Sequence, residues 1–213
     1  MAKNDNLKDF LTDVADAIRV KKGTEDLINP QDFSDEIKNL PSGGASGDIV
    51  ITSDSSNYYY GSKVSVTIGG KLTIIGNTSF TNDKRIVSVN IVAPITTIDI
   101  SAFQGCEALA AINIPNSTTL INNYAFRNCL ALEEITIPPS VEIIGATIFR
   151  GSGVRKIIVL RETPAKQWDT TFGSVADGRF VYVPDASLEA YKAATNWAAF
   201  ADAIRPISEL PNE

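Results

Sequence analysis

Residues 102–147 consist of two consecutive units of equal length, AFQGCEALAAINIPNSTTLINNY (102–124) and AFRNCLALEEITIPPSVEIIGAT (125–147). Each unit contains a short alternating stretch, Ala-Ile-Asn-Ile in the first and Glu-Ile-Thr-Ile in the second, followed by a proline. Alternation with β-branched residues is typical of a strand, and a proline favours the end of that strand. The two units therefore predict one short β-strand each, at the same position of a repeated structure.

The same period extends in both directions along the chain. Phenylalanines recur at this one constant spacing at Phe80, Phe103, Phe126, Phe149 and Phe172. Three aliphatic positions keep the period: Val66, Val89, Ile112, Ile135; Ile68, Ile91, Ile114, Ile137; and Ile75, Ile98, Ile121, Ile144. A unit of this length cannot bury its apolar edge alone, so neighbouring units are expected to stack. We predict a mixed α/β, β-rich fold built on a solenoid of about four to five coils.

The last unit departs from the strict period. The step from Ser152 to Ile157 is one residue shorter than the step from Cys129 to Ile135. We therefore expect the register to slip by one residue in that coil.

The two central units closely resemble the BspA-type leucine-rich repeat, which follows the pattern AF-x-x-C-x-x-L-x-x-I-x-I-P. The residues that carry the resemblance are Ala102-Phe103, Cys106, Leu109, Ile112, Ile114, Pro115, and again Ala125-Phe126, Cys129, Leu132, Ile135, Ile137, Pro138. The outer units depart from the pattern: the first reads Thr81-Asn82-Asp83 and lacks Cys, and the fourth has Ser152 for Cys and Leu160 for Pro. The resemblance covers roughly residues 64–207, and it implies a leucine-rich-repeat solenoid that binds a partner.

The C-terminal part, residues 176–213, has a different pattern. Residues 180–184 read as a last strand, and Asp185 is expected to be the N-cap of a helix that covers the final coil. A break near Thr195 and a short helix to Ile204 follow. We expect Trp168 and Trp197 to close the core. The end of the chain is similar to the closing segment of the same repeat family.

The N-terminal part predicts a separate module. Residues 1–40 contain two helical patterns and are expected to form a helical hairpin for anchoring or assembly, and residues 41–48 form a Gly/Ser linker. Residues 49–63 lead into the repeats of residues 64–175. The stretch LTDVADAIRVKKGTEDLINPQDFSDEIKNL is similar to a short segment of phage and prophage virion proteins, often tail-associated.

The composition excludes several functional classes. The 213 residues contain no histidine, so Ser-His-Asp and Cys-His catalysis and His-ligated zinc are absent. The net charge of −6 disfavours nucleic acid as a partner. Glu133, Glu134 and Glu142 lie close in sequence, but no pattern gives them the environment of an acid–base pair, and a solvated face is expected. We predict neither an enzyme nor a cofactor.

The two cysteines occupy one repeat position. Cys106 and Cys129 are separated by one full period, so they are expected to stack as buried thiols. Adjacent coils lie close enough for a disulfide, which remains an open alternative.

A binding surface is expected where side chains alternate with the buried aliphatic residues. The candidate residues are Tyr58, Tyr59, Tyr60, Ser88, Asn90, Asn113, Glu134, Thr136 and Lys156. Solenoids use such regular faces for binding. The mixed polar set suits a protein or a glycan, and a merely solvated face is the alternative.

These observations lead to two functional hypotheses. The first is a phage virion structural protein (tail, baseplate or capsid-decorating fibre) that contacts other virion proteins through residues 1–40 and a host-surface protein or glycan through the repeats. It is favoured because the N-terminal stretch shows no secretion signal, which a virion protein does not need. The second is a BspA-like adhesin on the bacterial cell surface. A hydrolase using Glu134 is a third, weaker hypothesis. We expect a homo-oligomer without membrane insertion.

Overall fold

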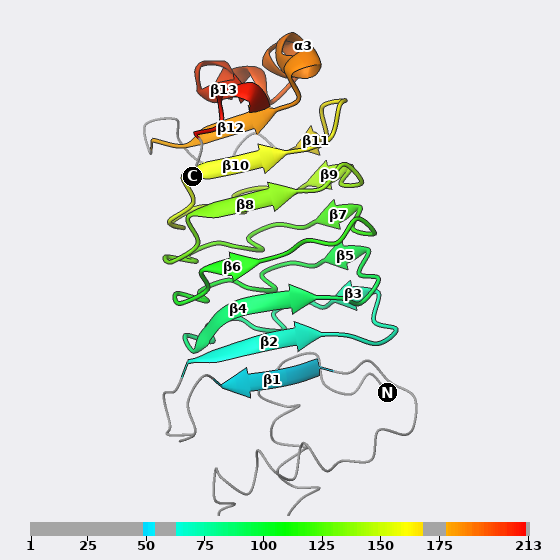
Figure 1. The fold of residues 1–213 in the computed structure, drawn as a ribbon, viewed down its shortest axis with the longest axis vertical. Coiled ribbons are helices and arrows are strands. Elements are labelled where there is room, and N and C mark those ends of the chain that lie inside the picture. The colour runs from blue at the N-terminus through cyan, green and yellow to red at the C-terminus, as the bar shows by residue number, and fades with distance from the viewer. Residues whose placement is uncertain (1–48, 54–62, 168–177, 212–213) are drawn as a thin grey trace, which may run out of the picture.

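The computed structural model describes residues 49–53, 63–167 and 178–211. The predicted hairpin and linker (1–48), the three tyrosines at 58–60, Trp168 and Phe172 lie outside the described residues. Within the described part the chain winds as a stack of coils, with an α-helix and 3-10 helices at the C-terminal end (Figure 1).

Each coil contributes one strand to the front of the stack, and all of these except β6 are longer than the strands of the second sheet (Figure 1). The front strands are β1 (Ile49–Ser53), β2 (Val64–Ile68), β4 (Ile86–Ile91), β6 (Ala111–Ile112), β8 (Glu134–Ile137), β10 (Lys156–Val159), β12 (Phe180–Val183) and β13 (Ile204–Pro206). They pair in parallel, except that β1 is antiparallel to β2. The structure therefore confirms a leucine-rich-repeat type of fold with mostly parallel strands and few helices.

A second sheet lies beside the front strands. It is formed by the short strands β3 (Ile74–Ile75), β5 (Thr97–Ile98), β7 (Leu120–Ile121), β9 (Ile143–Ile144) and β11 (Lys166–Gln167), paired in parallel in this order. The second residue of every strand is buried. The third aliphatic series of the sequence, which runs from Ile75 to Ile144, thus forms the inner row of this sheet.

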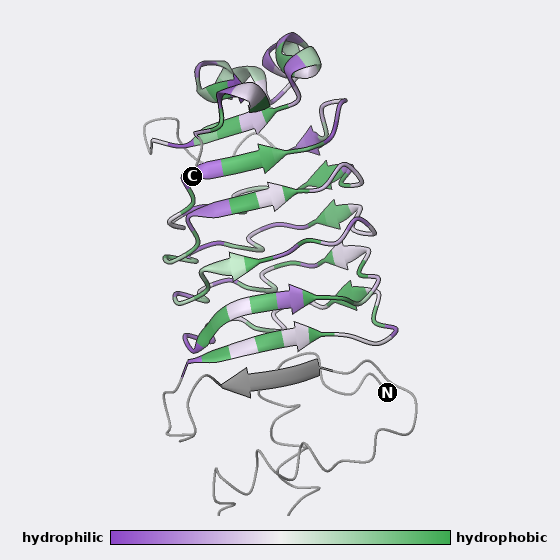
Figure 2. Ribbon diagram, viewed as in Figure 1, coloured by the Kyte–Doolittle hydropathy of each residue, from purple (hydrophilic) through white to green (hydrophobic). Residues whose placement is uncertain are grey.

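The alternation predicted from the sequence is visible in the front strands (Figure 2). In β2, residues 64, 66 and 68 are buried while Ser65 and Thr67 are partly exposed. Val66 pairs with Val89, and Val89 pairs with Ile112, so each partner lies one full period further along the chain. Ile157 pairs with Ile135 at a separation one residue short of that period, so the predicted register slip is confirmed.

The aromatic and thiol columns fill the interior. The rings of Phe80, Phe103, Phe126 and Phe149 are stacked with centroid separations of 5.0, 5.7 and 6.1 Å. Cys106 and Cys129 are fully buried free thiols. The Sγ of each donates to a phenylalanine carbonyl of the preceding coil at 3.1 Å. The prediction of a buried thiol column is confirmed.

Two positions in each central coil adopt left-handed backbone conformations. The φ angle is between 52° and 73° at Thr78, Ser101, Tyr124 and Thr147, and at Asn82, Gly105, Asn128 and Gly151. These are tight turns that recur once per coil. The second series alternates Asn and Gly, the residues that tolerate this conformation best.

The front ladder of hydrogen bonds is interrupted between β6 and β8. β6 is the last strand of one four-stranded sheet and β8 is the first strand of another. The second sheet continues past this point, because β7 pairs with β9. The stack is therefore continuous on one side and divided on the front.

The C-terminal cap closes the last coil with buried aromatic residues. It contains the 3-10 helix η2 (Asp185–Ser187), helix α3 (Leu188–Ala193), and the 3-10 helices η3 (Ala198–Ala203) and η4 (Ile207–Glu209). The indole Nε1 of Trp197 donates to the carbonyl of Ala165 at 2.8 Å, and its side chain is 1% exposed. The predicted role of Trp197 in closing the core is confirmed.

A buried arginine completes the cap. The guanidinium of Arg179, which is 5% exposed, donates to the carbonyl oxygens of Val154, Phe149 and Ser152 at 2.9, 2.9 and 3.1 Å. The carbonyl of Phe149 corresponds to those that accept from Cys106 and Cys129 in earlier coils. Arg179 thus binds the last carbonyls of the repeated column.

The predicted N-cap role of Asp185 is wrong. Neither η2 nor α3 has a side-chain cap hydrogen bond, and Ser187 rather than Asp185 precedes α3. The Oδ1 of Asp185 accepts from the backbone N–H of Ser208 at 3.1 Å instead. Hydrogen bonding with Ser208 lowers the pKa of this carboxyl. The carboxylate therefore ties the chain end to the cap.

Candidate binding surface on the front strands

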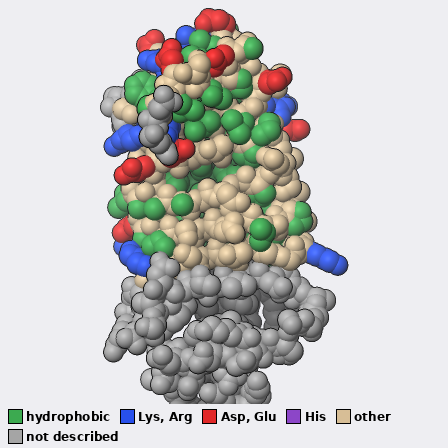
Figure 3. All heavy atoms as spheres, in the orientation of Figure 1, with side chains coloured by type: hydrophobic (Ala, Val, Ile, Leu, Met, Phe, Trp, Pro, Cys, Tyr) green, Lys and Arg blue, Asp and Glu red, His purple; other side chains and the backbone are tan. Residues whose placement is uncertain are grey.

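The candidate site is the outward side of the front strands, called here the strand face. Its residues form two rows that follow the strand register. The first row is Ser65, Ser88, Ala111, Glu134, Lys156, Phe180, and the second is Thr67, Asn90, Asn113, Thr136, Ile158, Tyr182, Arg205. Small side chains, most of them polar, make up the N-terminal half, and large apolar side chains occur among charged ones in the C-terminal half, where hydrophobic atoms gather in the space-filling view (Figure 3).

In the N-terminal half, small polar side chains contact one another or the backbone. The Oγ of Ser88 donates to the Oγ of Ser65 at 2.7 Å. Asn90 is exposed. In this half the two rows contain no large side chain.

Asn113 is exposed, but its amide binds the neighbouring strand. Its Oδ1 accepts from the N–H of Ile91 at 2.6 Å, and its Nδ2 donates to the carbonyl of Ile91 at 2.9 Å. The side chain thereby replaces the backbone partner that the short strand β6 does not supply. Asn113 extends the edge of β4 and is committed to that structural role.

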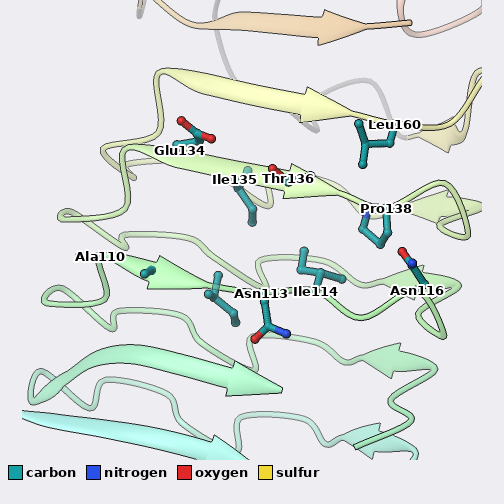
Figure 4. Close-up of a pocket in the computed structure, with 11 residues that line it drawn as sticks. Ala110, Asn113, Ile114, Asn116, Glu134, Ile135, Thr136, Pro138 and Leu160 are labelled. Carbon is teal, nitrogen blue, oxygen red and sulfur yellow. The ribbon is translucent and has the colours of Figure 1, made fainter. Parts of the chain in front are cut away.

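A groove of about 460 Å³ lies where the front ladder is interrupted (Figure 4). Ile112, Ile114, Pro138 and Leu160 contribute apolar walls, and Ala110 and Ala111 lie on the β6 side with small exposed side chains. Asn116 and Thr136 supply polar groups, and Asn113 and Glu134 also line the groove with side chains that already bind Ile91 and Lys156. The groove therefore offers an apolar recess bounded by hydrogen-bonding groups.

Large apolar side chains are exposed at the groove and beyond it. Leu160 is 41% exposed, and so is Phe180. The guanidinium of Arg205 lies over the Phe180 ring, 5.2 Å from its centroid. Lys156 and Glu134 form an ion pair across β8 and β10. An exposed aromatic ring beside a stacked arginine is the composition enriched in protein interfaces.

The strand face contains the described residues that the sequence suggested. Asn90, Asn113 and Thr136 are exposed, and Ser88, Glu134 and Lys156 are half-buried. Sequence reasoning missed Leu160, Phe180 and Arg205. Two signals pointed to the first two: Leu160 replaces the repeat proline, and Phe180 alternates with the buried Val181 and Val183. Arg205 has no such signal, because β13 lies outside the repeats.

The two cysteine thiols are buried. Burial raises the pKa of the Cys129 thiol to about 12, and burial raises that of Cys106 as well. The described residues contain no group of His, Cys, Asp or Glu side chains suited to a metal ion. Helices long and apolar enough to span a bilayer are also absent from this part of the chain.

The fold resembles that of solved bacterial leucine-rich repeat proteins. A leucine-rich repeat protein of Eubacterium ventriosum matches with 18% identity and a TM-score of 0.53, over 68% of this chain and 43% of its own. One from T. pallidum matches with 22% identity over 57% of this chain and 63% of its own, with a TM-score of 0.43. A leucine rich cell surface protein of Faecalibacterium prausnitzii matches with 16% identity over 74% of this chain and 55% of its own, with a TM-score of 0.38. At these identities the E. ventriosum protein supports the fold alone.

No curated protein matches the chain. Residues 52–166, more than half of the chain, match the family described as BspA type leucine rich repeat region, in six copies. This agrees with the parallel strands, the stacked phenylalanines and the thiol column. The chain belongs to the BspA-type leucine-rich repeat family.

Proposed function

We propose that this is a non-enzymatic binding protein whose strand face contacts a partner protein. The observation that carries the proposal is the groove between β6 and β8, which opens on the strand face beside the exposed Leu160. Recognition sites combine a concave apolar recess with a few polar groups in this way. The groove favours a protein over a glycan as partner, because the described residues that line it include no aromatic ring on which a sugar would stack.

We further propose that the protein is a phage virion component. The support is the resemblance of residues 11–40 to segments of tail-associated virion proteins. In this proposal residues 1–40 bind other virion proteins and hold the chain as a homo-oligomer, while the strand face binds a protein on the host surface. A bacterial cell-surface adhesin with the same strand face is the second candidate.

A pair of arginine substitutions tests the role of the strand face. Ala111→Arg places a long cation at the groove, where the native side chain is exposed. Thr119→Arg is the matched control, because Thr119 is exposed beside the second sheet. Binding to whole host cells or to isolated envelope protein should be lost in the first variant and kept in the second. Equal binding by both variants would contradict a role for the groove.

Particle composition tests the virion proposal. Mass spectrometry of purified virions should detect the chain at a stoichiometric level, and envelope fractions of uninfected cells should lack it. The reverse distribution would support the adhesin. Measurable hydrolysis that is lost in Glu134→Gln would instead revive an enzymatic role.

A further inference from the structure

The pair formed by Arg205 and Phe180 has features that the groove does not share. Arg205 lies on β13 and pairs with Tyr182, while Phe180 begins β12. The guanidinium carbon is 5.2 Å from the Phe180 ring centroid, and Nη1 donates to the carbonyl of Ile204 at 2.9 Å. Two contacts therefore hold the guanidinium in one orientation on the strand face.

The charge of Arg205 has no carboxylate partner in the part of the chain that the structure describes. Other cations nearby are already engaged: Lys156 pairs with Glu134, and Arg179 is buried against backbone carbonyls. A guanidinium carries five N–H donors, and Arg205 uses one of them on Ile204. Its remaining N–H groups can donate to the two oxygens of a carboxylate in bidentate geometry.

The surroundings of Arg205 are apolar. Phe180 is 41% exposed, and Ile158 lies next to Tyr182 in the second row of the strand face. A ligand that reaches the guanidinium therefore also covers aromatic and aliphatic side chains. A nucleic acid needs several basic side chains to bind its successive phosphates. The described strands present one stacked arginine here and no basic stripe, so the charge pattern disfavours nucleic acid.

We propose that Arg205, held on Phe180, binds a carboxylate of an acidic segment in the partner protein, and that an apolar side chain beside this carboxylate packs on Phe180 and Ile158. The inference rests on the proposed function, because it names the class of partner that the strand face recognises. A stacked, pre-oriented arginine loses less conformational entropy on binding than a free one.

Selection from a library of short random peptides tests the inference with the full chain. Peptides selected on the wild-type protein should be enriched in Asp or Glu next to an aliphatic or aromatic residue. Arg205→Gln replaces the guanidinium by a planar amide that still has N–H donors but carries no charge. This variant should abolish the enrichment. Lys166→Gln is the matched control, since Lys166 is an exposed cation on the second sheet. It should leave the enrichment unchanged.

Affinities of one selected peptide sharpen the result. Arg205→Gln should weaken binding by about tenfold or more, as loss of a charge-assisted contact does. Arg205→Lys keeps the charge but loses the planar stack, so an intermediate loss is expected. Replacing the acidic residue of the peptide by its amide should remove the difference between wild type and Arg205→Gln. Circular dichroism confirms that each variant is folded.

Three results would overturn the inference: no acidic enrichment on the wild type, the same enrichment on Arg205→Gln, or a change in oligomeric state with Arg205→Gln that makes a second copy the occupant. The inference can also fail while the proposed function holds. If Ala111→Arg abolishes host binding while Arg205→Gln leaves it intact, the strand face binds a protein but not through this arginine.

Discussion

A β-carbon at Gly153 would lie 2.1 Å from the carbonyl oxygen of Leu130 in the preceding coil. The N–H of Gly153 donates to the carbonyl of Cys129 at 3.0 Å, so the two backbones are held together. This close approach lies between Ser152 and Val154, where the coil is one residue short. The absence of a side chain at Gly153 is what lets the shortened coil keep its hydrogen bonds.

Gly153→Ala should therefore destabilise the protein by about 3 kcal/mol, because the methyl group meets backbone that cannot rotate away. Gly76→Ala is the control: the nearest atom to its new β-carbon is the Oγ of Ser79 at 3.5 Å, an ordinary contact. Its effect should stay within about 1 kcal/mol. Urea unfolding of both variants measures the difference, and equal midpoints would show that the coil relaxes.

Arg179→Met should separate the cap from the last coil. The variant removes the guanidinium that donates to the carbonyls of Phe149, Ser152 and Val154, at a cost of about 2–4 kcal/mol. The Phe149 carbonyl still accepts from the N–H and Oγ of Ser152. Arg155→Met is the control, because Arg155 is exposed and directly precedes β10. It should change the free energy of unfolding by less than about 0.5 kcal/mol. Thermal unfolding followed by circular dichroism compares the two. A similar melting temperature for both would refute the capping role.

Asn113→Ala should cost about 1–2 kcal/mol, because the variant removes both hydrogen bonds to the backbone of Ile91. Asn90→Ala, one strand away in the same row, should be nearly neutral for stability. This pair also separates structure from recognition: loss of partner binding in Asn90→Ala at unchanged stability would assign Asn90 to the interface. Matching stability losses in both variants would contradict the special role of Asn113.

The buried thiols should be unreactive in the folded protein. Burial raises the pKa of Cys129 to about 12, so an aromatic disulfide reagent at pH 8 should titrate both thiols only after denaturation. The folded state prefers the protonated thiols. Their contribution to stability is therefore complete below about pH 9 and is lost as the pH rises above it. A Cys106→Ala, Cys129→Ala double variant should show a flatter decline above pH 9, and rapid labelling of the native wild type would sink the prediction.

Thr147→Asn should raise stability by about 0.5–1 kcal/mol. Thr147 has a φ of 52°, which is costly for a β-branched residue, and its buried Oγ1 has no hydrogen-bond partner. Asparagine tolerates this conformation, as Asn82 and Asn128 show at the other left-handed position of their coils. Thr97→Asn, in the regular strand β5, should be neutral or destabilising. Melting temperatures in the opposite order would show that strain at Thr147 is absent.

The repeated part of the fold could be predicted because one period fixes many positions together. The spacing of Phe80, Phe103, Phe126 and Phe149 defines the coil length, and the short step after Ser152 defines the slip. The interruption between β6 and β8 could not be predicted, since Ile112 and Ile135 obey the same period as their neighbours. It depends on how far each strand pairs, which is a property of the assembled sheet.

The strand face was only partly predictable for a related reason. Alternation identifies which side chains point outward, so Asn90 and Thr136 were found. It does not show that the amide of Asn113 turns back onto Ile91, nor that β13 adds Arg205 beside Phe180. Asp185 was assigned to a helix cap because its position suited one, but the chain end supplied a competing donor at Ser208.

The interruption between β6 and β8 also has a mechanical consequence. Hydrogen bonds between coils run along the axis of the stack, so a pulling force on the two ends loads them in series. Among the described strands, the front ladder is broken at this joint, while β7 and β9 remain paired on the other side. The two parts of the stack should therefore bend relative to each other at this joint, with the β7–β9 pair as the hinge. Tension should open the groove before any coil unfolds.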